Sequence, residues 1–201
     1  MRHKGLIIAT VIFFLIVNTN YFWQTKIGIL AIPTFLLLVG VYIVLAGLLI
    51  GQLFFSIREK FADKQRLLVV ALLTTVLALT ILKPTGLINF DKLEGKDLFI
   101  AQREGSANCM ITFKLKENNK FLERSVCFGV TEIRGDYKLK GDTIVFSNVE
   151  LGRGESDYYE FAIIKQTDNK YKDRLGDLIR YKDQNDTTGQ EIWIIKNDLT
   201  Q

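Results

Sequence analysis

The sequence predicts a membrane protein in two parts: three N-terminal transmembrane α-helices, then an all-β antiparallel domain, either a small barrel or a sandwich of about eight strands. Three long apolar runs without internal charge fall within residues 1–89, and short period-two segments separated by turn residues fill residues 90–201. These patterns divide the chain into a transmembrane region (residues 1–83), a tether (residues 84–96) and a soluble β-domain (residues 97–201).

The three apolar runs are residues 5–23, 27–55 and 67–82. A helix of about 20 apolar residues crosses a bilayer. The third run is slightly short, but Arg66 and Lys83 at its ends can reach the interface with their long side chains. The first run has no small-residue cleavage site after it, which favours an uncleaved anchor over a cleaved signal peptide.

The basic residues between the runs predict an orientation. Arg2 and Lys4 precede the first run, four basic residues lie in the loop of residues 56–66, and only Lys26 separates the first two runs. Cytoplasmic loops are enriched in Lys and Arg. We therefore expect a multi-pass protein of the inner or plasma membrane with a cytoplasmic N-terminus and, after three crossings, an extracytoplasmic C-terminal domain. An even number of crossings would place that domain inside.

The net charge of +4 is unevenly divided between the two parts. Residues 1–89 carry a net charge of +6, and residues 90–201 carry −2. A domain that binds a nucleic-acid polymer would need a basic surface, and the β-domain has no basic excess. The expected partners are therefore the lipid bilayer and a protein or lipid-like ligand.

Three glycines in the second run, Gly40, Gly47 and Gly51, are candidates for close helix packing. Gly47 and Gly51 form a G-x-x-x-G motif, in which small residues let two helices approach closely. We favour packing among the chain's own helices, and formation of a homo-oligomer through the same residues is the alternative.

Eight strand-like segments follow residue 90, and no helix is predicted there. Sequential short strands favour an antiparallel meander that closes on itself to protect its edges. A packed core is favoured over a hollow, ligand-holding barrel. The predicted strands are residues 97–104, 109–116, 121–128, 131–140, 143–147, 157–166, 176–183 and 191–197. The predicted core includes Val145, Tyr159, Phe161, Ile163, Trp193 and Ile195.

The only two cysteines, Cys109 and Cys127, are candidates for a disulfide. A hairpin with a loop over residues 117–119 places them opposite each other. This register also places Phe113 on the same face as Glu123, a conflict that a β-bulge could resolve. Two separate buried thiols are the alternative. A disulfide would persist in an oxidising compartment, which agrees with the orientation expected from the basic loops.

The residues offer little for catalysis. The only histidine is His3, beside the first apolar run, and the spacing of the cysteines is too wide for a C-x-x-C motif. We expect no enzyme activity, metal or cofactor. The loop of residues 151–157 is the best candidate for binding a partner, with Arg153, Glu155 and the neighbouring Tyr158 as the contacting residues; a plain connector is the alternative.

The stretch GDYKLKGDTIVF, residues 135–146, resembles hairpins of lipocalin-like β-domains in small bacterial envelope proteins of unknown function. The resemblance covers residues 97–166, lacks the G-x-W that many lipocalins show near the first strand, and implies no particular site residues. The layout of the chain is also similar to membrane-anchored β-barrel effectors of cyclic-nucleotide antiphage signalling. That similarity implies a cytoplasmic barrel that senses a cyclic nucleotide and acts on the membrane.

Two functions therefore follow. The first is a membrane protein that displays a noncatalytic extracytoplasmic β-domain for binding or envelope interaction. The alternative is a cytoplasmic cyclic-nucleotide sensor that is coupled to membrane-disrupting helices. The side of the membrane on which the β-domain lies separates the two.

Overall fold

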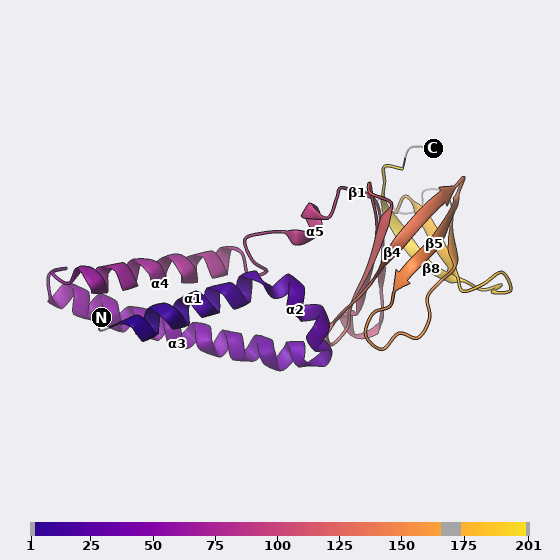
Figure 1. The fold of residues 1–201 in the computed structure, drawn as a ribbon. Coiled ribbons are helices and arrows are strands. Elements are labelled where there is room, and N and C mark those ends of the chain that lie inside the picture. The colour runs from indigo at the N-terminus through magenta and orange to yellow at the C-terminus, as the bar shows by residue number, and fades with distance from the viewer. Residues whose placement is uncertain (1–2, 166–173, 200–201) are drawn as a thin grey trace. The chain divides into compact units, whose positions relative to one another are not determined.

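The chain folds into two compact units, one helical and one built around a β-barrel. A computed structural model describes residues 3–165 and 174–199, and Figure 1 shows its helices and strands. The helical unit consists of the chain up to Gln24 together with Leu30–Asn89, and the barrel unit consists of Thr25–Ile29 together with the chain from Phe90 onward.

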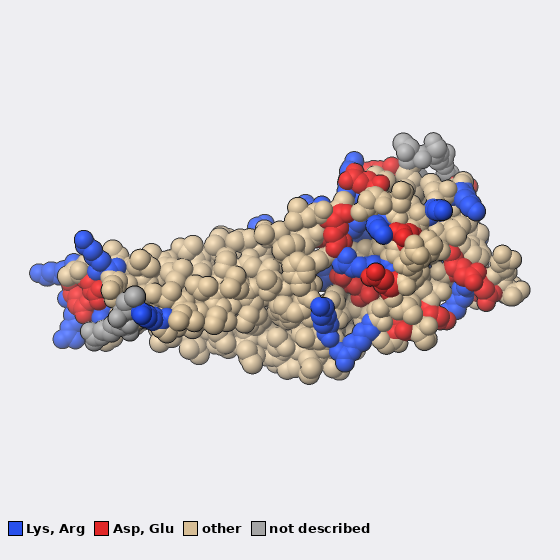
Figure 2. Space-filling model, in the orientation of Figure 1, with Lys and Arg blue, Asp and Glu red and all other residues tan. Residues whose placement is uncertain are grey.

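The helices of the N-terminal part follow the apolar runs. Asp63 begins the last of them, because its carboxylate accepts the backbone N–H groups of Gln65 and Arg66 at 2.9 and 3.2 Å. Figure 2 shows Lys and Arg side chains gathered at the turn before that helix, whereas the lengths of the helices carry uncharged residues. The helices are α1 (Lys4–Asn18), α2 (Asn20–Ile27), the 3₁₀ helix η1 (Gly28–Leu30), α3 (Ala31–Arg58) and α4 (Lys64–Leu82).

We expected the first apolar run, residues 5–23, to form one continuous helix, but the structure divides it between two helices. α1 ends at Asn18, and α2 begins at Asn20. The hydroxyl of Thr19 donates a hydrogen bond to the carbonyl of Leu15 at 2.8 Å. Polar side chains of this kind bond to nearby backbone and compete with the helical pattern. The polar stretch at residues 18–20 therefore interrupts the run.

Two helical stretches are long and apolar enough to cross a membrane. They are Asn20–Arg58, with 39 residues, and Lys64–Leu82, with 19 residues. α1 has 15 residues, or about 22 Å at the usual helical rise, which is less than the hydrocarbon thickness of about 30 Å. The described residues thus contain two candidate spans, and a crossing by α1 stays a prediction.

α4 packs against both α1 and α3 in the helical unit. Leu73 is fully buried at the centre of this contact, with Phe13 of α1 and Leu45 of α3 nearby in the same cluster. Most other apolar side chains of α3 are exposed, including Phe35 and Leu37, each 63% exposed. An apolar surface of this extent suits a lipid environment rather than water.

Gly40, Gly47 and Gly51 do not lie at a contact between the chain's own helices. A Cβ atom added to any of the three would meet no atom within 4 Å. The favoured expectation of intramolecular packing is therefore wrong, because α3 uses a different face, which includes the buried Leu45 and Ser56. Homo-oligomer formation through the glycines stays a prediction.

The β-domain is a closed antiparallel barrel, so the sandwich alternative is excluded. Each strand pairs with the next one along the chain, and β8 pairs with β1. Gly141 has a φ of +59° in the tight turn between β4 and β5, a conformation that glycine adopts readily. The strands are β1 (Asp97–Glu104), β2 (Met110–Lys116), β3 (Lys120–Val126), β4 (Val130–Lys140), β5 (Thr143–Glu150), β6 (Phe161–Lys165), β7 (Gly176–Tyr181) and β8 (Gln190–Asn197).

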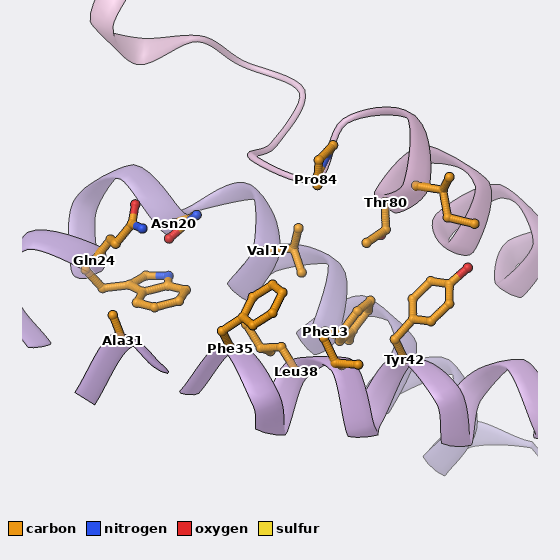
Figure 3. A pocket seen from close by; sticks show the side chains of 13 residues that line it. Phe13, Val17, Asn20, Gln24, Ala31, Phe35, Leu38, Tyr42, Thr80 and Pro84 are labelled. Atoms are coloured by element: carbon orange, nitrogen blue, oxygen red, sulfur yellow. The ribbon is translucent and has the colours of Figure 1, made fainter. Parts of the chain in front are cut away.

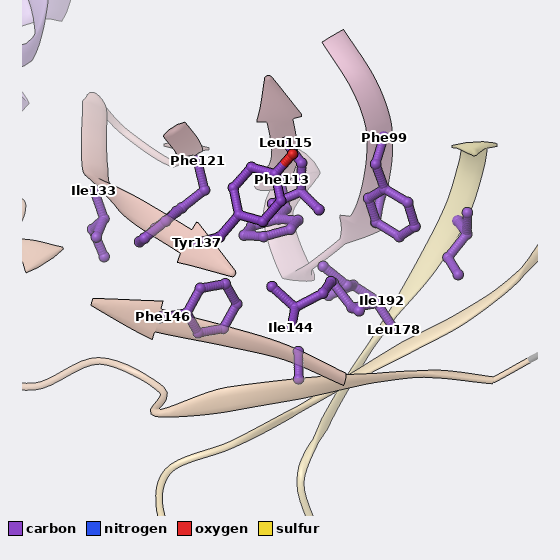
Figure 4. Packing of buried hydrophobic residues seen from close by; sticks show 13 residues of the cluster. Phe99, Phe113, Leu115, Phe121, Ile133, Tyr137, Ile144, Phe146, Leu178 and Ile192 are labelled. Carbon is purple, nitrogen blue, oxygen red and sulfur yellow. The ribbon is translucent and has the colours of Figure 1, made fainter. Parts of the chain in front are cut away.

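Side chains fill the barrel interior, and Figure 4 shows the buried rings and aliphatic groups pointing toward one another. Phe113 lies among three aromatic neighbours, with ring centroids 5.8 to 6.4 Å apart. The buried cluster consists of Phe99, Ala101, Phe113, Leu115, Phe121, Ile133, Tyr137, Ile144, Phe146, Ala162, Leu178, Ile192 and Ile194.

Five of the six predicted core residues lie on the outer face of their strands, whereas the sixth, Tyr159, precedes β6 and packs against the buried core. Trp193 and Ile195 are 44% and 41% exposed, whereas their neighbours Ile192 and Ile194 are buried. In the same way, the buried residues of β5 and β6 are the neighbours of the predicted ones, and Val145, Phe161, Ile163 and Tyr159 are only partly buried. Both faces of these strands carry apolar residues, and the outer face uses them in pairs such as the stacked rings of Phe161 and Tyr181.

A short helix, α5 (Phe90–Leu93), corrects the expectation that no helix follows residue 90. Asp91 of this helix forms ion pairs with Lys114 and with Lys116, the latter at 2.8 Å. Both lysines also contact Asp97, at 3.0 and 3.3 Å, and Lys116 is only 2% exposed. The second half of the predicted tether therefore belongs to the barrel unit.

Candidate functional site

The cysteines lie at one end of the β2–β3 hairpin and are joined by a disulfide bond. Their Cα atoms are 4.5 Å apart. β2 and β3 pair in the expected register, with Met110 opposite Val126 at the end next to the cysteines. No bulge interrupts this pairing, so the expected conflict between Phe113 and Glu123 must be resolved in another way.

The conflict is resolved by a buried charge pair inside the barrel. Glu123 lies opposite Phe113 and is only 8% exposed, and its Oε2 accepts a hydrogen bond from the guanidinium of Arg180 on β7. Arg180 is fully buried. Burying a single charge is costly, whereas a paired and hydrogen-bonded charge is tolerated. Glu123 therefore faces the core because Arg180 is there to meet it.

Two tyrosines from the loop between β5 and β6 complete this group. The hydroxyl of Tyr158 donates to Glu123 Oε2 at 2.6 Å, and its ring stacks on Phe121 with centroids 5.3 Å apart. The ring of Tyr159 lies 4.5 Å from the guanidinium carbon of Arg180, a cation–π contact. The loop thus places one ring in the core and one against the buried cation.

Gln190 links the group to the surface. Its Oε1 accepts hydrogen bonds from both Tyr159 and Arg180. Arg180 Nε has no hydrogen-bond partner among the described residues. Arg180 lies near the end of β7, and Gln190 is the first residue of β8, so both lie at the end of the barrel where the β7–β8 turn is found. We call the set Glu123, Tyr158, Tyr159, Arg180 and Gln190 the mouth cluster.

The electrostatics of the mouth cluster keep its groups in defined states. Burial and the adjacent negative charge of Glu123 raise the pKa of the Tyr158 hydroxyl well above its usual value, so this group remains a neutral donor. Burial by itself would lower the pKa of Arg180, but the facing carboxylate of Glu123 raises it instead. The guanidinium is therefore charged at every physiological pH.

A depression of about 410 Å³ lies beside the mouth cluster and is lined in part by Tyr159, Gln190 and Lys182. Asp186 shapes its rim, because its carboxylate accepts the backbone N–H groups of Gly189 and Lys182. These bonds lower the pKa of Asp186 to about 2. A molecule in the depression would meet an aromatic ring, an amide and an ammonium group.

The same end of the barrel carries the disulfide and the β5–β6 loop. In an up-and-down barrel, the ends of odd-numbered strands meet at one end. Cys127 follows β3, the loop of residues 151–160 follows β5, and the β7–β8 turn follows β7. This end therefore gathers most of the features that we singled out in the sequence of the β-domain.

The three predicted binding residues are separated by the structure. Tyr158 lies in the mouth cluster, whereas Arg153 and Glu155 are exposed in the loop before it and do not contact the cluster. Sequence reasoning missed Glu123, Arg180 and Gln190. A signal was available for two of them, since Arg180 lies on the same face of β7 as the buried Leu178, and Glu123 lies on the same face of β3 as the buried Phe121.

The described residues include no group of three or more His, Cys, Asp or Glu side chains that could hold a metal ion. The chain matches no protein-family model, no curated protein and no solved structure. Of the mouth cluster, Tyr159 and Gln190 line the depression and are placed to stack with a ligand or hydrogen-bond to it, whereas Arg180 is buried and paired with Glu123.

Proposed function

We propose that the chain is a multi-pass membrane protein whose β-barrel serves as a noncatalytic binding module outside the cytoplasm. The observation that carries the proposal is the pairing of Cys109 with Cys127 in an uninterrupted hairpin register. Disulfides persist in oxidising compartments and are rare in the cytosol. A loop closed by this bond gains about 3 kcal/mol of stability by the chain-entropy model.

The charge distribution supports the same orientation by an independent argument. Arg58, Lys60, Lys64 and Arg66 surround the turn between α3 and α4. A cytoplasmic location suits this turn by the positive-inside rule. α4 then carries the chain outward, and the barrel follows on the far side. A cytoplasmic N-terminus requires α1 to provide a third crossing, with tilt or local bilayer thinning compensating for its length.

The mouth cluster is the proposed binding face, and a protein or lipid-like molecule is the proposed ligand. Tyr159 and Gln190 line the depression and hydrogen-bond to each other. Aromatic rings with a polar edge are favoured at binding surfaces because they offer large contact area and directed hydrogen bonds. The loop of residues 151–160 adds Arg153 and Glu155 at the exposed rim.

Alkaline phosphatase fusions test the orientation, because that enzyme is active only after export. We expect an active fusion at the C-terminus and an inactive fusion after Ala62, in the turn between α3 and α4. Green fluorescent protein at the same two sites should give the reverse pattern. A stable but inactive C-terminal phosphatase fusion, with a fluorescent partner, would contradict the proposal.

Thiol labelling tests the disulfide separately. Mass spectrometry of protein alkylated without reductant should find neither Cys109 nor Cys127 modified, and prior reduction should expose both. Two freely labelled thiols in unreduced protein would remove the observation that carries the proposal.

The second candidate is the cytoplasmic cyclic-nucleotide sensor, an antiphage effector that acts on the membrane. The observation that favours it is that Tyr159 and Lys182 both line the depression, since bases stack on aromatic rings and phosphates pair with cationic side chains. A fluorescent C-terminal fusion would move this candidate to first place. The next measurement would then be binding of cyclic nucleotides to the wild type and to Tyr159→Ala.

A further inference from the structure

A pocket of about 270 Å³ lies within the helical unit, where α1 and α2 meet α3 and the end of α4. Figure 3 shows aromatic and aliphatic side chains along it and two amide side chains near one end. The lining is therefore amphipathic, with an apolar floor and a polar rim. The floor includes Phe13, Val17, Phe35 and Leu38, and the rim includes Asn20 and Gln24.

The interruption of the first apolar run creates this pocket and holds it in shape. The indole N–H of Trp23 donates to the carbonyl of Ile16 at 3.1 Å, which folds α2 back toward the end of α1. Asn18 accepts the backbone N–H of Leu87 at 2.8 Å and so holds the segment after α4 beside the same end. Both bonds join segments that line or border the pocket, so they hold its walls together.

The walls of the pocket are open to the surroundings of the helices. Phe35 is 63% exposed and Ile81 is 69% exposed, although both line the pocket. An apolar chain from the surrounding lipid can therefore enter sideways. Lys83, which is exposed, directly precedes Pro84 in the pocket wall. A cation at this position can attract a negatively charged headgroup.

We propose that this pocket binds one acyl chain of an anionic phospholipid. The chain would lie on the floor formed by Phe13, Phe35 and Leu38. The headgroup would lie near the amides of the rim and the ammonium group of Lys83. The proposal rests on the membrane location of the helices but not on the orientation of the barrel, so the phosphatase fusions can fail without affecting it.

Quenching of Trp23 fluorescence tests the proposal in the full-length protein. The chain has two tryptophans, so the Trp193→Phe variant in detergent reports on Trp23 alone, which lines the pocket. We expect titrated phosphatidylglycerol with brominated acyl chains to quench saturably at about one lipid per chain. Quenching that rises linearly without saturation would mean unspecific partitioning and would overturn the proposal.

Two filling variants and one matched control locate the binding. Ala31→Leu and Val39→Phe add side-chain volume at pocket-lining positions, and each should raise the half-saturating lipid concentration about tenfold or more. Ala71→Leu adds the same volume as Ala31→Leu at an exposed position of α4 that does not line the pocket, and it should change nothing. Equal behaviour of the filling variants and the control would overturn the assignment.

Headgroup choice is tested with three probes. Brominated phosphatidylglycerol should bind about fivefold more tightly than brominated phosphatidylcholine, and Lys83→Gln should remove that difference. Dibromostearic acid distinguishes a free fatty acid from a phospholipid as the source of the chain. Tighter saturable binding of the fatty acid, or equal affinity for both phospholipids, would overturn the choice of an anionic phospholipid.

Discussion

The helical unit and the barrel unit use apolar residues in opposite ways. Leu37 on α3 is 63% exposed, whereas Phe113 in the barrel is fully buried, and the same contrast holds for most apolar residues of α3 and for the barrel core. Most charged side chains of the barrel lie outside; the buried exceptions are Arg180 with Glu123, and Lys116, which pairs with Asp91 and Asp97. The comparison teaches that the place of an apolar side chain depends on the surrounding medium: a domain in water buries its apolar residues, and the exposed apolar surface of α3 suits lipid.

Removing a phenyl ring should have the largest effect, and only in the barrel. Phe113→Ala should lower the free energy of unfolding by about 3–5 kcal/mol, because the ring is fully buried among other aromatic side chains. Phe54→Ala on α3 should cost less than about 1 kcal/mol, because that ring is 62% exposed. Thermal unfolding in detergent, followed by near-ultraviolet circular dichroism, measures both. Equal losses would break the comparison.

Breaking the buried charge pair should cost nearly as much. Glu123→Gln leaves the guanidinium of Arg180 buried without its counter-charge, so we expect a loss of about 3–5 kcal/mol of stability. Asp157→Asn removes one partner of Lys182 in an exposed pair and should cost less than about 1 kcal/mol. The double variant Glu123→Leu, Arg180→Met should be more stable than the single variant Glu123→Leu and more stable than the single variant Arg180→Met. If it is not, the pair does more than neutralise charge.

A charge added at an exposed apolar position should have different effects in the two units, because lipid disfavours a charged side chain and water does not. Leu37 and Phe128 are each 63% exposed, the first on α3 and the second in the β3–β4 loop of the barrel. Leu37→Arg should disfavour membrane insertion by about 2.5–3.5 kcal/mol, whereas Phe128→Arg should change stability by less than about 0.5 kcal/mol. The fraction of protein that resists alkaline carbonate extraction measures insertion. Normal insertion of Leu37→Arg would argue against a lipid-facing α3.

The smallest effect concerns the ion pairs that join α5 to the barrel. Burial opposes ionisation of Asp91, but hydrogen bonds from Lys114 and Lys116 lower the pKa of this carboxyl below 3.8. Burial likewise opposes the charge of Lys114, but bonds to Asp91 and Asp97 raise the pKa of this lysine above 10.5. Stability from Asp91 is therefore present above pH 3.8 and is lost as the pH falls through its lower folded value.

Stability from Lys114 is present below pH 10.5 and is lost as the pH rises through its higher folded value. We thus expect a plateau between these limits in the pH dependence of the barrel's melting temperature. Asp91→Asn should lower the free energy of unfolding at the plateau by about 1–2 kcal/mol and weaken the acid-induced fall in melting temperature. An unchanged acid limb in that variant would show that Asp91 does not stabilise the fold through these pairs.

Local signals predicted much of the fold. Turn residues and period-two segments located all eight strands, and the three-residue loop at 117–119 was enough to predict the register of β2 and β3. These features depend on neighbours in the chain, so one sequence contains them. The candidate site was predicted only in part: Tyr158 was singled out, whereas Arg180 and Glu123 were not, because their partners come from strands far apart in the sequence.

The sequence by itself determined the division into an apolar helical region and a β-domain, the approximate number of strands and the hairpin register that places the cysteines opposite each other. Only the tertiary structure decided which face of each strand lies inside. Ile144 and Val145 are equally apolar, yet closure of the barrel buries only the first. It also decided that Glu123 could face the core, since a buried carboxylate is stable only where Arg180 and Tyr158 meet it. Hydrophobic pattern is a local property, whereas partnership across a closed barrel is not.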